Sequence, residues 1–225
     1  MVRNMTTRTL RDLLWNRRTV PLAATLAGLA VFVFPTQAAP GGMLPPPATY
    51  QVDPVHSFVY FSAWHHVVGT VRGRFEKVTG TIAASPKPQD CAVDITIDTA
   101  SISTQNTRRD DDLRGPDFFD VKQYPTATYR GQGITRQGNA WVMNGTLTIR
   151  GISKTVPLRF SFKGLFPDTP AGQPPRAAFH GAAETHRADF GMTRDNIAEL
   201  GVPPAPGADV QLEIDVEANR SQPAP

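Results

Sequence analysis

The chain has 225 residues, 40% of them hydrophobic, and a formal net charge of +3 at pH 7. Removing residues 1–38, which carry five arginines and a single acid, Asp12, leaves 18 basic and 19 acidic residues. The remainder is therefore close to neutral, which excludes the broad basic surface of a nucleic-acid-binding protein, and its single cysteine excludes an intramolecular disulfide and a multi-cysteine metal site.

Residues 1–38 have the organisation of a secretory signal peptide. An arginine-rich leader precedes the apolar run Val20 to Phe34, and small residues end at Ala38. We expect cleavage after Ala38 and a periplasmic protein with no stable membrane insertion. An uncleaved membrane anchor is the alternative, but about 15 apolar residues fall short of the roughly 20 that span a bilayer. The pair Arg17-Arg18 leaves a twin-arginine export route open beside ordinary secretion.

The rest of the chain divides into a spacer, a domain and a tail. Residues 39–48 contain Gly41-Gly42 and three consecutive prolines, a composition typical of a spacer. We expect one β-domain over residues 49–219, because this length suits a single all-β domain. Residues 220–225 are expected to form a disordered tail.

From Tyr50 onward the chain predicts a series of β-strands. Apolar or aromatic residues alternate with polar ones in most of these runs, which is the period of a strand with one buried face. Cys91 shares the apolar face of its run, so we expect a buried thiol rather than a reactive one. The expected strands beyond Tyr50 span residues 57–64, 67–75, 78–83, 91–99, 127–134, 141–149, 156–164, 178–190 and 210–218.

Short turns join several of these runs and favour antiparallel pairing of sequential strands. Gln137-Gly138-Asn139 and Arg150-Gly151 have hairpin chemistry, whereas residues 167–176 and 201–208 are irregular loops rich in proline and glycine. This arrangement predicts an all-β fold, either an up-and-down barrel or a sandwich. We favour the barrel, because closing the sheet removes exposed edges. If one strand edge is exposed, it could pair with a second copy of the chain, so a homodimer is a further possibility.

The segment Thr107 to Tyr124 differs from its surroundings because it combines many charges with two adjacent phenylalanines. We expect a helix of about two turns, capped by Thr107 in a Thr-x-x-Asp capping box. Gly115, in the left-handed conformation, and Pro116 are expected to end it. So short a helix is not stable alone and must be held by packing. The expected anchors are Leu113, Phe118 and Phe119.

The charged residues of this segment have a structural and a functional interpretation. Asp110, Asp111 and Asp112 at the start of a helix ordinarily interact with its dipole and with neighbouring arginines, although paired carboxylates also serve acid–base catalysis. Arg109 and Arg114 are five residues apart, so one can face solvent and the other an opening. A guanidinium at the mouth of an apolar cavity would suit a phosphate or a quinone oxygen.

The histidines are the candidate metal ligands. His65 and His66 are adjacent on a strand, so their rings face opposite ways. His180, Glu184 and His186 share one face and have a known combination of ligand types. On a strand, however, His180 and His186 lie about 20 Å apart at roughly 3.3 Å per residue. We therefore expect no metal and no cofactor. The sequence also lacks a nucleotide-binding glycine loop, a nucleophile elbow and a His-Glu-x-x-His helix, which disfavours familiar enzymes.

A set of short motifs occurs in order along almost the whole chain after residue 48. They are Y-Q-V-D-P-V-H-S from Tyr50, V-R-G-R-F from Val71, G-T-I from Gly80, R-D-D-D-L-R-G-P-D-F-F-D from Arg109, Y-P-T-A-T-Y from Tyr124, G-T-L-T-I-R-G-I-S-K-T-V from Gly145 and R-A-D-F-G from Arg187. In this order and spacing the chain resembles the YceI-like family of exported polyisoprenoid-binding proteins, over roughly Thr49 to Asn219.

The resemblance implies a lipocalin-like antiparallel β-barrel of about eight strands with one short helical insertion. Its apolar interior would hold a linear isoprenoid, such as a quinone tail or a polyprenyl phosphate. The segment from Thr107 would cover the mouth, and inward positions of the first long strand would include Ala63. The ligand-binding residues expected on this basis are Val59, Phe61, His65, Arg109, Asp110, Leu113, Arg114, Phe118, Phe119, Trp141, Phe160 and Phe162.

Three functions remain open at this point. The leading hypothesis is a non-catalytic periplasmic carrier or reservoir for an isoprenoid lipid. An enzyme on a lipidic substrate, with Asp110, His65 and Arg109 as acid, base and anion holder, is the second. The third is a structural or stress-related barrel filled by its own side chains, which 12 phenylalanines keep open. Asp111-Asp112 and His66-Val67 depart from the family pattern and leave the head group unassigned.

Overall fold

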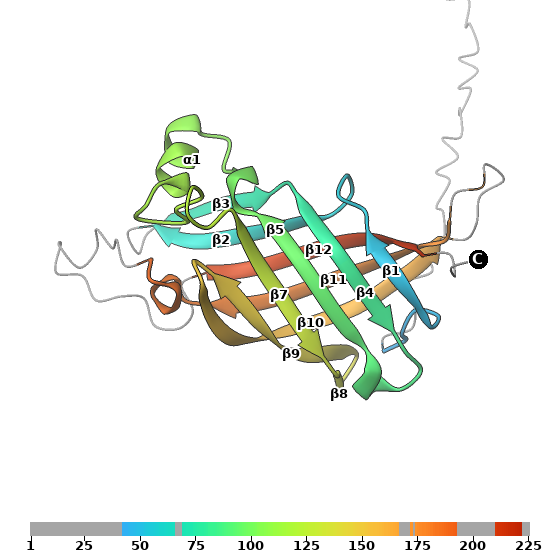
Figure 1. Cartoon of the computed structure of the whole chain (residues 1–225). Helices are drawn as coiled ribbons and strands as arrows, with labels where there is room; N and C mark the ends of the chain where they lie inside the picture. Colours follow the sequence, from blue (N-terminus) through green and yellow to red (C-terminus); the bar gives the residue numbers. More distant parts are fainter. Residues whose placement is uncertain (1–41, 66–68, 167–171, 173, 193–209, 222–225) are drawn as a thin grey trace, which may run out of the picture. The chain divides into compact units, whose positions relative to one another are not determined.

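The computed structural model describes residues 42–65, 69–166, 172, 174–192 and 210–221 (Figure 1). These residues lie within one compact unit, Gln37–Pro225, while the other unit, Met1–Thr36, falls wholly outside the described ranges. The expected signal peptide with its cleavage site, the start of the spacer, the loop at 201–208, most of the loop at 167–176 and the last four residues of the tail therefore lie outside the described residues.

Twelve strands form one sheet in which every neighbouring pair is antiparallel. They are β1 (Ala48–Val52), β2 (Phe58–His65), β3 (Gly69–Phe75), β4 (Val78–Ala84), β5 (Ala92–Asp98), β6 (Ile102–Ser103), β7 (Thr126–Gln132), β8 (Thr135–Gln137), β9 (Ala140–Ile149), β10 (Ile152–Phe166), β11 (Arg176–Thr185) and β12 (Val210–Arg220). In the described ranges, the helices are α1 (Thr107–Arg114) and three short 3₁₀ helices, η1 (Pro88–Asp90), η2 (Thr99–Ser101) and η3 (Arg187–Phe190).

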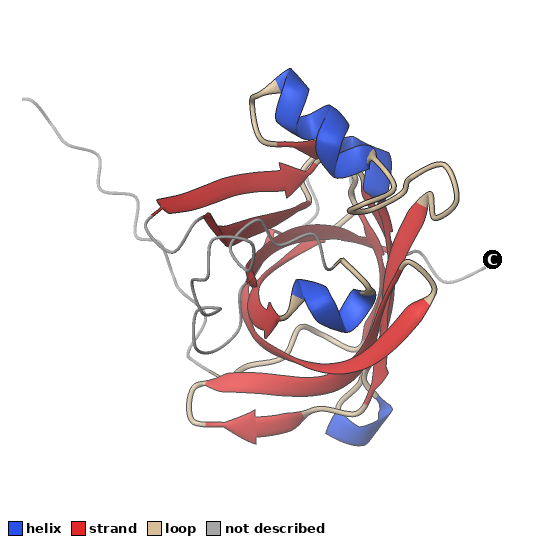
Figure 2. Ribbon diagram, turned by 90° about the vertical axis from the view of Figure 1, so that its left-hand side faces the viewer, coloured by secondary structure: helices blue, strands red, loops and turns tan. Residues whose placement is uncertain are grey.

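The sheet closes on itself because β12 also pairs with β1. The closed order is β1-β4-β5-β7-β9-β10-β11-β12, so eight strands surround the interior, and Figure 2 shows them as a ring. The prediction of an eight-stranded, lipocalin-like antiparallel barrel with one helical insertion is confirmed.

The remaining strands β2, β3 and β6 extend the barrel wall at one end. β12 pairs with β2 through Val210–Asp215 and with β1 through Ala218–Arg220, so β1 and β2 are two parts of one bent strand. Glu217 lies at the bend, where its backbone N–H and carbonyl both hydrogen-bond to the Ser57 hydroxyl at 3.1 Å. β3 with β4 and β5 with β6 repeat this arrangement. Sequential strands thus follow one another around the barrel.

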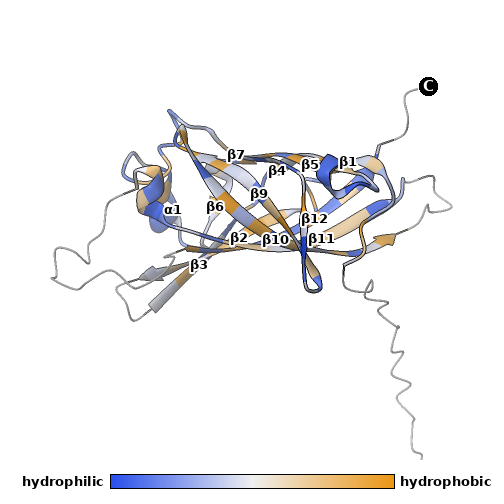
Figure 3. Ribbon diagram, turned by 90° about the horizontal axis from the view of Figure 1, so that it is seen from below, coloured by the Kyte–Doolittle hydropathy of each residue, from blue (hydrophilic) through white to orange (hydrophobic). Residues whose placement is uncertain are grey.

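Apolar and polar residues alternate along the strands, which gives the barrel an apolar interior and a polar outer face. In β12, for example, Leu212 and Val216 pack into the hydrophobic core, whereas Gln211 and Glu213 are exposed. Single strands accordingly carry both hydrophobic and hydrophilic residues in Figure 3. The prediction for Cys91 is confirmed, because the thiol is buried in the core.

Both helix ends differ from the expectation for the segment after Asn106. Thr107, the expected N-cap, is instead the first residue of the helix, and the N-cap is Asn106, whose side-chain oxygen accepts a hydrogen bond from the Arg109 N–H at 3.0 Å. Asn is as good a cap as Thr, and its position one residue earlier places the oxygen over the free amides. Gly115 is extended, with φ −72° and ψ 174°, rather than left-handed. The chain folds back instead through a hydrogen bond from Phe119 N–H to the Leu113 carbonyl.

The strand expected over residues 178–190 is wrong at its end. β11 stops at Thr185, and residues 187–190 form η3. Gly191 ends this helix in the left-handed conformation, with φ 72°, and its N–H returns to the Ala188 carbonyl. A glycine tolerates this conformation without strain, so the turn is encoded locally even though the alternation of the preceding residues continues into it. The consequence is that η3 turns across the end of the barrel (Figure 2).

Candidate functional site

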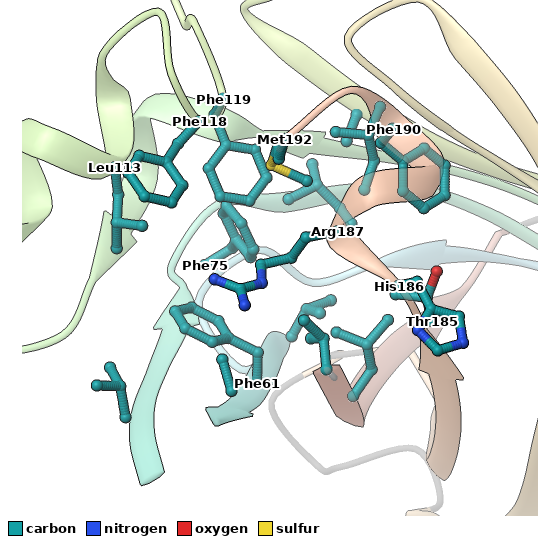
Figure 4. A pocket seen from close by; sticks show the side chains of 18 of the residues that line it. Phe61, Phe75, Leu113, Phe118, Phe119, Thr185, His186, Arg187, Phe190 and Met192 are labelled. Carbon is teal, nitrogen blue, oxygen red and sulfur yellow. The ribbon is translucent and has the colours of Figure 1, made fainter. Parts of the chain in front are cut away.

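A cavity of about 420 Å³ lies inside the barrel at the end that carries α1 and η3. Its lining is mostly hydrophobic and comes from β2, β3, β5, β7, β9, β11, β12, α1 and the segments after α1 and β11 (Figure 4). The lining residues are Val59, Phe61, Ala63, Trp64, Val71, Phe75, Ile97, Arg109, Asp112, Leu113, Phe118, Phe119, Ala127, Leu147, Ile149, Thr185, His186, Arg187, Phe190, Met192, Val210 and Leu212.

Aromatic side chains join the cap to the barrel wall. The rings of Phe75 and Phe119 meet edge to face with centroids 5.3 Å apart, and Phe61 lies 5.9 Å from Phe75 on the other side. Edge-to-face pairs of this kind stabilise beyond the area that they bury. Phe119, supplied by the segment after α1, therefore holds that segment over the cavity, as Figure 4 shows.

The buried carboxylate of Asp110 fixes α1 in place. It accepts hydrogen bonds from the backbone N–H of Thr104, at 2.8 Å, and from the Thr104 hydroxyl. Arg109 completes the group, because its guanidinium donates to the Thr104 hydroxyl at 2.7 Å and to the Thr104 carbonyl at 3.0 Å. Arg109 also borders the cavity, whereas Asp110 does not. The function of Asp110 in this geometry is to position the helix.

Arg114 has a similar structural position on the other side of α1. Its guanidinium donates to the carbonyls of Ala100 at 3.0 Å and Ile102 at 2.7 Å, and lies 3.2 Å from the carboxylate of Asp111. These contacts tie the end of the helix to η2 and β6, and Arg114 does not line the cavity. Of the two arginines expected near an opening, Arg109 borders it and Arg114 faces away.

The opposite wall of the cavity comes from the end of β11 and the segment after it. Thr185, His186 and Arg187 line it together with Phe190 and Met192. In Figure 4 the Arg187 guanidinium extends from η3 toward Phe75 and Phe61. Arg187 was not among the predicted ligand residues, although it is the first residue of the motif R-A-D-F-G. The sequence signal for this position was an arginine that follows an alternating strand and precedes a glycine able to end a helical turn.

The other expected ligand residues are divided between this cavity and the rest of the barrel. Val59, Phe61, Leu113, Phe118 and Phe119 line it. Trp141 and Phe162 are buried in the core instead, with exposed fractions of 8% and 7%. Phe160 lines a second, smaller cavity of about 90 Å³. His65 ends β2 opposite Gly69, and its side chain lies outside the described residues.

Tyr129 lies at a level of the barrel between residues that line the larger cavity and residues that line the smaller one. On β9, Leu147 lines the larger cavity and Met143 the smaller one, and the inward position between them is Gly145. The Tyr129 hydroxyl reaches this level and lies 3.0 Å from the Gly145 nitrogen and from the Met143 carbonyl oxygen, and 2.9 Å from the carbonyl oxygen of Val156. Burial raises the pKa of Tyr129 above its ordinary value of 10.0, so the phenol is neutral at physiological pH.

The expected metal candidates are not brought together as a set. His186 borders the large cavity, whereas His180 lies on β11 with its Nδ1 2.8 Å from the carboxylate of Asp215 on β12. Within the described ranges, two groups of three residues place possible metal-ligating atoms within 4.8 Å of one another. They are Asp53 with His56 and Glu217, and His180 with Glu213 and Asp215.

Comparison with known proteins gives consistent matches over the barrel. The model of the YceI-like domain matches residues 50–218. A UPF0312 protein of Pseudomonas aeruginosa strain LESB58 is 32% identical over 202 residues, which cover 88% of this chain and 97% of the relative. The crystal structure of BcnA from Burkholderia cenocepacia is similar with a TM-score of 0.62 and 25% identity, over 75% of this chain and 99% of that one.

A further solved structure supports the architecture. A polyisoprenoid binding domain from Saccharophagus degradans has a TM-score of 0.58 over 77% of this chain and 99% of that domain. At 16% identity this likeness concerns the fold alone. A separate observation is that, in the part of the chain that the structure describes, no helix has the length and hydrophobicity to cross a membrane.

Proposed function

The chain belongs to the YceI-like family, and we propose that it is an exported, non-catalytic protein that holds a linear isoprenoid lipid in the larger cavity. The observation that carries this proposal is an apolar cavity of about 420 Å³ with guanidinium groups at its border. Export is part of the proposal, because residues 1–38 have the organisation of a signal peptide. The site of action would then be the periplasm.

The size of the cavity sets the length of tail that it encloses. At roughly 30 Å³ for each water-sized group, 420 Å³ accommodates about 14 non-hydrogen atoms, or three isoprene units. Burying about 15 carbons gains on the order of 12 kcal/mol at about 0.8 kcal/mol per methylene, against association costs of about 4–15 kcal/mol. A much shorter chain would not offset those costs. A longer tail would extend from the mouth.

The polar lining supports one orientation of the proposed ligand. Five lining residues are polar, and all of them come from α1, from the last residue of β11 or from the segment after it. They are Arg109, Asp112, Thr185, His186 and Arg187. A guanidinium offers paired donors to phosphate or carbonyl oxygens. We therefore orient the ligand with its tail among Phe61, Leu147 and Leu212 and its oxygen atoms toward Arg187 and Arg109.

The geometry supports binding rather than catalysis. Asp110, the acid of the enzyme hypothesis, is only 7% exposed, and its carboxylate is bound to Thr104 away from the cavity lining. A general acid must reach the reacting group directly or through one water. The presence of the cavity also disfavours the third hypothesis, in which side chains of the protein fill the barrel.

Ligand capture tests the proposal directly. The mature protein is purified from its native compartment and examined by native mass spectrometry, then exposed to isoprenoid alcohols, phosphates and quinones of 10 to 40 carbons. We expect a retained isoprenoid, with affinity rising up to about 15 carbons and little beyond. A protein that is isolated empty and takes up none of these compounds would contradict the proposal.

A matched pair of variants shows where the lipid lies. Ala63 lines the cavity, whereas Ser62, its neighbour on β2, points to the outer face. Ala63→Phe should reduce isoprenoid binding at least tenfold by filling the mouth, and Ser62→Phe should leave it within about twofold. Equal binding by both variants would place the ligand elsewhere.

A further inference from the structure

A second group of residues with the chemistry of a binding site lies on the outer wall of the barrel. Asp215 on β12 pairs in register with His180 on β11, and Glu213 lies two residues before Asp215 on the same face. The partner of Glu213 in the register is Ala182, which has only a methyl group. His180 and Glu213 line a hollow of about 520 Å³ here, together with residues that include Tyr60, Ser62, Arg72, Glu184 and Gln211.

We propose that His180, Glu213 and Asp215 bind a divalent transition-metal ion of the zinc class. One ligating atom from each residue lies within 4.8 Å of the others, and His180 Nδ1 is already 2.8 Å from Asp215 Oδ1. In a tetrahedral zinc site with bonds of about 2.0–2.2 Å, neighbouring ligand atoms are roughly 3.4 Å apart. Small side-chain rotations would therefore close the three residues around an ion.

The combination of ligands determines the class of metal. One imidazole nitrogen and two carboxylate oxygens suit Zn²⁺, Mn²⁺, Fe²⁺ or Co²⁺, whereas Ca²⁺ and Mg²⁺ prefer ligand sets made of oxygen alone. Two carboxylates also balance the charge of a divalent ion. Three protein ligands leave a coordination position that a water molecule from the open hollow can fill.

A comparison inside the same barrel separates this group from an ordinary ion-pair cluster. Asp53, His56 and Glu217 have the same three residue types, but Arg176 already occupies the space between them. Its guanidinium lies 3.2 Å from Asp53, 2.9 Å from Glu217 and 3.4 Å from His56 Nδ1. Among the described residues, no lysine or arginine forms a salt bridge with Glu213 or Asp215. At the Asp53 cluster the positive charge comes from Arg176 of the protein. At the His180 cluster it would come from a metal ion bound from solution.

Zinc binding to the untagged mature protein tests this inference. Titration calorimetry and native mass spectrometry with ZnCl₂ alone should detect one ion per chain, with Mg²⁺ and Ca²⁺ as comparison ions. Glu213→Gln and Asp215→Asn preserve side-chain shape and should each weaken zinc binding about tenfold or more. His56→Ala is the control and should change the zinc affinity by no more than about twofold, because Arg176 occupies the cluster to which His56 belongs.

Cobalt supplies a second readout that is independent of affinity. Co²⁺ bound to the wild-type protein should give the visible absorption of a four- or five-coordinate site, and His180→Ala should abolish it. Circular dichroism of each variant confirms that the barrel is folded. The inference is wrong if wild-type protein binds no zinc, or if the Glu213, Asp215 and His56 variants bind it equally.

Discussion

The ring of Tyr129 lies so close to Gly145 that a Cβ atom at position 145 would come within 2.4 Å of the tyrosine Cζ. This contact belongs to the level of the barrel between residues that line the larger cavity and residues that line the smaller one. A glycine is required here by the approach of a side chain rather than by its own backbone conformation. The pair therefore fixes the close packing of β7 against β9 at this level.

Gly145→Ala should destabilise the barrel by about 1–3 kcal/mol, because the added methyl group forces Tyr129 out of its position. Chemical denaturation followed by tryptophan fluorescence measures the free energy of unfolding. Thr146→Ala, at the exposed neighbouring position of β9, is the control and should change it by less than about 0.5 kcal/mol. Similar values for the two variants would show that Tyr129 relocates without cost.

Tyr129→Phe should lower the free energy of unfolding by about 1–3 kcal/mol, since it leaves buried backbone groups of β9 and β10 without their hydrogen-bond partner. It should also change the alkaline pH dependence. Burial raises the pKa of Tyr129 in the folded state above its unfolded value near 10, so its contribution is complete below pH 10 and is lost as the pH rises through the folded pKa. Denaturation between pH 8 and 11 should show a weaker decline for the variant.

The strands were predictable from the sequence because one face of each is buried in a shared interior. In β12, apolar Val210, Leu212, Ile214 and Val216 alternate with polar residues, and this local pattern requires no knowledge of the partner strand. The hairpin at Arg150-Gly151 was also predictable. Both residues adopt positive φ, 53° and 73°, between β9 and β10, as the turn chemistry indicates.

The site was predictable only where a lining residue belongs to such a pattern. Val59 and Phe61 follow from the inward positions of β2, whereas Arg187 depends on the turn that ends η3 at Gly191, which carries the chain across the barrel. Asp110 and Arg114 were expected at the ligand because they are charged. Their actual partners, Thr104 and the Ile102 carbonyl, are 6 and 12 residues away and are known only from the folded structure.

Asp53→Asn should reduce the stability of the folded protein at neutral pH. It should also make that stability less dependent on pH in the acid range. Burial raises the pKa of Asp53, but the hydrogen bonds from His56 and the Val55 N–H and the charge of Arg176 outweigh it and lower the pKa. Its contribution is therefore present above the unfolded value near 3.9 and is lost as the pH falls through the lower folded value. Thermal unfolding between pH 2 and 7 tests this. Asp94→Asn, at an exposed pair with Arg130, should have almost no effect.

The double variant Phe118→Ala and Phe119→Ala should loosen the cap, because Phe119 loses its edge-to-face contact with Phe75. We expect a loss of about 2–4 kcal/mol in stability and faster release of a bound isoprenoid. Asp111→Ala should cost less than about 0.5 kcal/mol, since its side chain is 68% exposed and pairs with Arg114 only at the surface. Release rates of the bound isoprenoid, measured by its transfer to acceptor vesicles, compare the double variant with Asp111→Ala. A larger effect of Asp111→Ala would favour a catalytic function for this segment.

Arg187→Gln should weaken binding of a lipid with an anionic head group and spare a lipid without one. A guanidinium–phosphate contact is worth about 1.5–3 kcal/mol, so affinity for farnesyl phosphate should fall about 10- to 100-fold. Affinity for the hydrocarbon farnesene should stay within about twofold, because the apolar lining is unchanged. Arg114→Gln is the matched control: that arginine bonds the carbonyls of Ala100 and Ile102 outside the cavity, so the variant should lower stability without separating the two ligands. Titration of both ligands against both variants measures this. If Arg187→Gln weakened farnesene as much as farnesyl phosphate, the guanidinium would support the cavity wall rather than hold a head group.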